Sequence, residues 1–125
     1  MLTIRGESIP QHLQRYETLG DWMGHDNFRQ ILVSELGNTD YEFLIFVHEL
    51  IEQALCMKRG ITDEMVTAYD RAYEGTSSPG DDLACPYHKE HVYASAVEDS
   101  ICKELGLDPK EYDKFLDNYC HGEEK

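Results

Sequence analysis

The spacing of hydrophobic and polar residues changes once along the chain, near Asp40. Before this point, short runs rich in β-forming residues are separated by turn-forming ones, which is typical of strands and hairpins. The predicted strands cover Leu13–Thr18, Gly20–Met23 and Phe28–Val33, with a turn at Gly24–Asn27 between the last two. The first third of the chain therefore predicts a small antiparallel sheet or hairpin.

After Asp40, hydrophobic residues recur at helical spacing and predict about four helices. Asp40, Thr62 and Asp108 are suited to cap helix N-termini, because their side chains can accept hydrogen bonds from the free N–H groups of a first turn. The predicted helices run from Asp40 to Gly60, from Thr62 to Tyr73, from Pro86 to Leu105, and onward from Asp108. We therefore predict an α+β fold, with residues 1–125 in one domain around one core.

The composition limits the classes of partner. The 125 residues carry a formal net charge of −14 at pH 7 without a cluster of Lys and Arg, which argues against nucleic acid. The longest apolar run, Phe43–Val47, is far shorter than the roughly 20 residues of a membrane span. The N-terminus lacks the pattern of a signal peptide. We expect a soluble cytoplasmic protein whose four cysteines stay reduced and form no zinc ribbon.

The first predicted helix carries polar residues although it is hydrophobic around most of its circumference, which indicates a central, buried position. His48 and Glu52 are about 40° apart around the helix and one turn apart along it, so both side chains can reach one ion. Glu49 lies about 60° from Glu52, where it could hold a water bound to the same ion and take its proton. These residues predict half of a divalent-metal site.

The string His48-Glu49-Leu50-Ile51-Glu52 resembles the active-site helix of zincin metallopeptidases, in the HExxE variant in which glutamate replaces the second histidine of HExxH. A small sheet ahead of this helix is also similar to the minimal zincin arrangement. The resemblance implies that His48 and Glu52 bind zinc and that Glu49 is the catalytic general base. A carboxylate ligand also makes such a site accessible to manganese or magnesium. The whole chain also resembles small uncharacterised bacterial and phage proteins, which implies no function.

A catalytic zinc site uses about three protein ligands, so another element must complete the predicted site. His91 and Glu98 are the best candidates, because they lie on a stripe of the third predicted helix that is otherwise small or apolar. His91 could bind the ion directly, with Glu98 as a further ligand or as an acceptor for an imidazole N–H. Asp70 and Glu74 on the second helix are the reserve candidates.

Each assignment has a simpler structural alternative. His48 could be a core histidine bonded to a carbonyl group, with Glu49 and Glu52 on the solvent face of the helix. His91 and Glu98 could instead pair with each other through a water molecule. Under this interpretation the polar residues would hold the fold together without a metal.

Three functions follow from these patterns. The first is a metal-dependent hydrolase that cleaves peptide or amide bonds in a peptide or small molecule, with zinc as the metal. The second is a non-catalytic domain stabilised by its metal, such as a phage-type accessory or interaction protein. The third rests on Glu49-x-x-Glu52, which resembles half of the magnesium-binding signature of all-α nucleotide pyrophosphohydrolases, with Glu98-Asp99 as the nearest second half.

Overall fold

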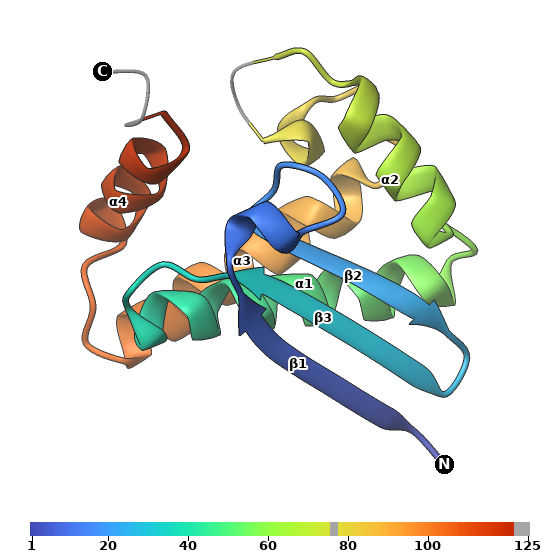
Figure 1. Cartoon of the computed structure of the whole chain (residues 1–125), viewed down its shortest axis with the longest axis horizontal. Coiled ribbons are helices and arrows are strands. Elements are labelled where there is room, and N and C mark those ends of the chain that lie inside the picture. Colours follow the sequence, from blue (N-terminus) through green and yellow to red (C-terminus); the bar gives the residue numbers. More distant parts are fainter. Residues whose placement is uncertain (76–77, 122–125) are drawn as a thin grey trace.

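The computed structural model describes residues 1–75 and 78–121, with side chains as far as residue 119 (Figure 1). Its elements confirm the predicted α+β class, because a small sheet is followed by helices. The strands are β1 (Thr3–Ile9), β2 (Gly20–His25) and β3 (Phe28–Ser34). The helices are α1 (Thr39–Lys58), α2 (Asp63–Ala72), α3 (His88–Glu104) and α4 (Pro109–His121), and the short 3-10 turns are η1 (Gln11–Leu13) and η2 (Pro79–Asp81).

The sheet has the strand order β1-β3-β2. β2 and β3 form the predicted antiparallel hairpin, with Trp22 paired opposite Ile31. β1 runs parallel to β3 on the other side, so the sheet is mixed rather than purely antiparallel. The strand predicted at Leu13–Thr18 is wrong. Leu13 ends η1 and is 62% exposed, and the residues after it form a loop in which Arg15 pairs with Asp21 of β2.

α1 is the central helix, as its hydrophobic circumference predicted. It packs against β2 and β3 on one side and against α3 on the other (Figure 1). Leu44 and Cys56 of α1 are completely buried, together with Ile31 of β3 and Cys102 of α3. Burial of such side chains is the main force that holds the layers together, at roughly 1.5–3 kcal/mol for a side chain the size of leucine or isoleucine.

The helix boundaries differ slightly from the predicted ones. Asn38, not Asp40, caps α1, because its side chain accepts a hydrogen bond from the Tyr41 N–H at 3.1 Å. Thr62 caps α2 as predicted, accepting from the Met65 N–H at 3.2 Å. α3 begins at His88, two residues after Pro86. None of the described helices is long and apolar enough to cross a membrane.

Candidate metal centre

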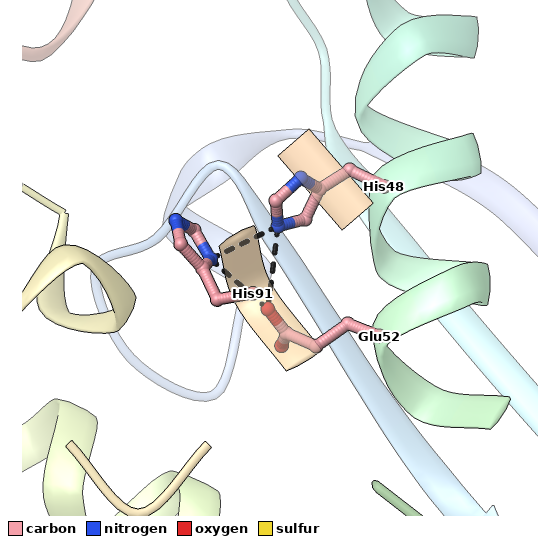
Figure 2. A group of neighbouring side chains, drawn as sticks. All are labelled: His48, Glu52 and His91. Atoms are coloured by element: carbon pink, nitrogen blue, oxygen red, sulfur yellow. Dashed lines mark hydrogen bonds and ion pairs between the residues drawn. The ribbon is translucent and has the colours of Figure 1, made fainter. Parts of the chain in front are cut away.

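Three side chains from two helices meet between α1 and α3. His48 and Glu52 project from α1 and His91 from α3, and Figure 2 shows the three pointing toward one another. The His48 Nε2 atom lies 3.1 Å from His91 Nδ1 and 3.3 Å from Glu52 Oε2, and the latter two atoms are 3.1 Å apart. This group could hold a metal ion. The three side chains are only 5–12% exposed.

Helix geometry and one turn position the three side chains of this cluster. One helical turn separates His48 from Glu52, so the α-helix itself places them side by side. The approach of His91 depends on the η2 turn, which packs against α3. Gly80 lies against the His91 ring so closely that a Cβ atom on residue 80 would collide with it. A side chain larger than hydrogen at this position would therefore push the ring away from the other two groups.

Neighbouring carboxylates favour one nitrogen of each imidazole as the position of its proton. His48 Nδ1 lies 2.8 Å from Glu98 Oε1, and His91 Nε2 lies 3.1 Å from Asp81 Oδ1. An ionised carboxylate only accepts hydrogen bonds, so His48 Nδ1 donates to Glu98, and the ion pair with Asp81 favours the proton of His91 on Nε2. In the neutral rings, His48 Nε2 and His91 Nδ1 are then unprotonated and direct their lone pairs at each other and at Glu52.

The remaining carboxylate oxygens are also held. Glu52 Oε1 accepts a hydrogen bond from the buried Trp22 indole N–H at 3.1 Å, which leaves Oε2 directed at the two histidines. Glu98 Oε2 accepts a short hydrogen bond from the Tyr112 hydroxyl of α4. Each of the three converging groups is therefore oriented from behind by a second residue, an arrangement that is common around protein metal ligands.

Three hydrogen-bond acceptors that face one another repel unless a cation lies among them. Their separations of 3.1–3.3 Å are close to, and slightly shorter than, the spacing around a tetrahedral ion. Bonds of about 2.0–2.1 Å to such an ion place neighbouring ligand atoms roughly 3.3–3.4 Å apart. The cation could be a proton on one of the rings or a metal ion. The geometry of the three atoms is compatible with a metal ion.

The pKa values of His48 and Glu52 reflect the charges around them. Burial alone would lower the pKa of His48, but hydrogen bonds to Glu52 and Glu98 outweigh it and raise this pKa well above its ordinary value. Burial would raise the pKa of Glu52, yet hydrogen bonds to His48 and His91 lower it to about 2. Glu52 is therefore an anion throughout the neutral range, and the site attracts positive charge.

Glu49 stands beside the cluster without belonging to it. It is half-buried and lies over Gly20, where a Cβ atom on residue 20 would come within 2.7 Å of its Cγ. Burial and then the charge of Glu52 raise the pKa of Glu49 well above its ordinary value, against a lowering effect from His48. Among the described residues we find no hydrogen-bond donor paired with its carboxylate, so its oxygens are available to a water molecule.

The other candidates from the sequence occupy different places. Glu98 is not in the three-residue cluster and instead accepts from His48, the second of the two roles considered for it. Asp70 accepts hydrogen bonds from the hydroxyls of Tyr16 and Tyr87. Glu74 lies exposed beyond the end of α2. Neither of these reserve candidates belongs to the cluster.

Two residues that contact the cluster had no assigned role in the sequence. Trp22 is one of them, and the need of a buried indole N–H for an acceptor is the signal that could have indicated it. Asp81 lies in the stretch between the second and third predicted helices, which is rich in Gly, Ser and Pro, ten residues before His91. Only the folded path of η2 reveals its contact with that ring, and no local pattern indicated it.

Comparison of the chain with protein-family models, with curated proteins and with solved structures gives no match. The resemblance to zincins is therefore supported by no family match. The structure does bring together His48, Glu52 and His91, and this group is compatible with a bound metal.

Proposed function

We propose that this protein binds one divalent metal ion through His48, Glu52 and His91 and uses it to hydrolyse a peptide or amide bond. The observation that carries the proposal is the convergence of three acceptor atoms within 3.3 Å of one another, each oriented from behind by another residue. Three protein ligands leave one position of a tetrahedral ion for water, as in catalytic zinc sites.

The donor set favours zinc. Two imidazole nitrogens and one carboxylate suit Zn²⁺, whereas Mg²⁺ prefers six oxygen ligands in octahedral geometry. Manganese is the next candidate, because it accepts both imidazole and carboxylate ligands. When bound here, zinc would polarise a substrate carbonyl and lower the pKa of a coordinated water.

Glu49 is the residue we assign to proton transfer. It adjoins both proposed ligands of α1 and, within the described part of the chain, has no hydrogen-bond donor paired with its carboxylate. A general base needs a free carboxylate within reach of the attacking water, and it then passes the proton to the leaving amine. Gly20 leaves the space in which this carboxylate lies.

Burial of the cluster favours a second function, in which the ion only stabilises the packing of α1 against α3. Counted with their backbone atoms, His48 and Glu52 are 6% and 4% exposed, which limits the approach of a large substrate. A structural metal would raise the melting temperature in the same way as a catalytic one. The two functions differ in one readout, because only the catalytic site loses activity when Glu49 is changed while its metal stays bound.

The pyrophosphohydrolase-like alternative has less support. Both carboxylate oxygens of Glu98 are engaged, by His48 and by Tyr112, so this residue does not face Glu49 and Glu52 as a second half of an acidic magnesium site would. The three-stranded sheet also departs from that all-α architecture.

Peptide cleavage provides the experiment that tests the proposed reaction. Zinc-loaded protein would be incubated with a mixture of peptides from a digested proteome, and new termini would be read by mass spectrometry. We expect cleavage that a chelator stops and that added zinc restores. Intact peptides in every metal condition would contradict hydrolysis of peptide bonds and leave the stabilising metal as the better account.

Replacing Asp81 with alanine should weaken metal binding about 10-fold or more, because His91 loses the carboxylate that fixes its tautomer and orientation. The affinity would be measured by competition with a chromophoric chelator. Asp40→Ala is the matched control, since it removes the same charge from an exposed position in the first turn of α1. Equal affinities of the Asp81 and Asp40 variants would show that Asp81 does not support a ligand.

Removal of the metal should lower the melting temperature more at about pH 8 than at about pH 6. The raised pKa of His48 stabilises the metal-free fold below the unfolded-state pKa of about 6.5, and this stabilisation is lost as the pH rises toward the folded-state value. Metal affinity rises over the same window, since bound histidines must be unprotonated. Glu52 contributes no slope there, because its pKa is about 2.

Melting curves with and without chelator at the two pH values measure this difference. In His48→Gln, the effect of the chelator on the melting temperature should not depend on pH, because this variant has neither the titrating ring nor the ligand. If the chelator lowers the melting temperature of the wild-type chain equally at both pH values, the proton and the metal do not compete for one site.

A further inference from the structure

One edge of the sheet presents free backbone groups. The Thr3 N–H donates to the Asn27 carbonyl at 2.8 Å, and the Ile9 carbonyl accepts from the Glu35 N–H at 2.8 Å. The backbone N–H and C=O groups of the odd-numbered residues of β1 therefore point toward β3. In a strand, successive backbone groups point to opposite sides, and the N–H and C=O groups of Ile4, Gly6 and Ser8 therefore point away from the sheet. β1 forms the outer edge there (Figure 1).

The opposite edge is protected in a way that β1 is not. On β2, the Met23 carbonyl accepts a hydrogen bond from the Gln53 side chain of α1 at 2.9 Å. Residues 3–8 of β1 are all exposed, and Leu2 and Ile4 are 51% and 43% exposed. β1 also lacks proline and lysine, which commonly prevent pairing at exposed sheet edges.

The sequence of β1 is complementary to itself in one antiparallel register. A two-fold axis at Gly6 sets Ile4 opposite Ser8 of a second copy and Gly6 opposite its own equivalent. The outward backbone groups of these residues would then form about six hydrogen bonds. The same register sets Arg5 opposite Glu7 of the second copy, in the non-hydrogen-bonded positions where side chains lie closest.

Charge selects this register over its neighbours. A shift of the axis to residue 5 would pair Arg5 with Arg5, and a shift to residue 7 would pair Glu7 with Glu7. Like charges directly opposite each other destabilise a strand pair, whereas two Arg5–Glu7 pairs stabilise it. Only the axis at Gly6 satisfies both the backbone groups and the charges.

The side chains on the helix side of β1 allow the close approach. Gly6 lies under the Phe46 ring of α1, and the Ser8 hydroxyl donates to Glu42 at 2.6 Å. The side chains of the even-numbered residues of β1 therefore lie on the face of the sheet that α1 covers. Ile4 is on this face and would lie diagonal to Gly6 of the second copy, near the Phe46 ring that covers it. Its exposed apolar surface would then be covered as well.

We propose that two copies of this chain associate through β1 in this register and form one continuous six-stranded sheet. The interface is isologous, so it closes at two copies and leaves no further free β1 edge. It lies at the opposite edge of the sheet from β2, whose Trp22 contacts the candidate metal centre. The dimer is therefore independent of the proposed function, and either one can fail alone.

Sedimentation velocity of the full-length untagged protein tests this proposal, at about 0.15 M salt so that long-range repulsion is screened. We expect twice the mass of one chain. Arg5→Glu and Glu7→Arg should each weaken the dimer about 10-fold or more, because each creates like-charge pairs across the axis. The double variant Arg5→Glu/Glu7→Arg restores opposite charges and should recover an affinity near that of the wild-type protein.

Glu17→Arg is the matched control, since it changes the net charge as Glu7→Arg does at an exposed loop position. It should leave the mass unchanged, and circular dichroism would verify that all variants fold. A wild-type chain that stays monomeric over the whole concentration range would overturn the proposal. So would a dimer that both single reversals leave intact, or one that the double variant fails to recover.

Discussion

Replacing His48 with alanine is expected to abolish binding of the metal ion and to lower the free energy of unfolding by about 3–5 kcal/mol. The change removes a proposed ligand and also leaves the buried carboxylate of Glu52 and the partly buried carboxylate of Glu98 without the histidine that they share. An uncompensated buried charge is among the most destabilising changes in a protein interior. Metal content and urea unfolding of the purified variant would measure the two effects.

His25→Ala is the appropriate control, because His25 is exposed at the end of β2. His88 is less suitable, since its Nδ1 lies 2.8 Å from the Gly80 carbonyl and helps to hold the η2 turn near His91. Metal content that stays the same in His48→Ala and in His25→Ala would exclude His48 as a ligand.

The second large effect is expected for Glu49→Gln, which should keep the metal and reduce hydrolysis by a factor of about 10² or more. Glutamine has nearly the same shape and fits the space over Gly20, but it cannot accept a proton from water. The measurement pairs metal content with the rate of peptide cleavage. Equal loss of metal in Glu49→Gln and Glu52→Gln would instead make both residues ligands and favour the pyrophosphohydrolase-like alternative.

Local patterns in the sequence predicted the elements that local physics determines. The β2–β3 hairpin follows from β-forming runs on either side of a turn, and the pairing of His48 with Glu52 follows from helix geometry alone. The stripe on the third predicted helix also identified His91, because a histidine among small and apolar positions must face a neighbouring element. α1 and α3 do pack together with these faces in contact.

Long-range contacts account for what the sequence did not predict. β1 pairs in parallel with β3, and each of its residues lies opposite a residue 25 positions later in the chain. Residues 3–8 of β1 are all exposed, so the strand has no alternation between buried and exposed positions. The contact of Asp81 with His91 depends on the path of a turn between helices. Asp81 is itself 55% exposed, so burial gave no reason to single it out.

Metal analysis of the untagged protein, purified without a chelating resin, tests the central claim most directly. The three converging acceptors predict about one equivalent of zinc or manganese per chain, with a chelator removing the metal and lowering the melting temperature. Protein that contains no metal, takes up none from added zinc, and melts at the same temperature with and without chelator would contradict the claim. The cation among His48, Glu52 and His91 would then be a proton.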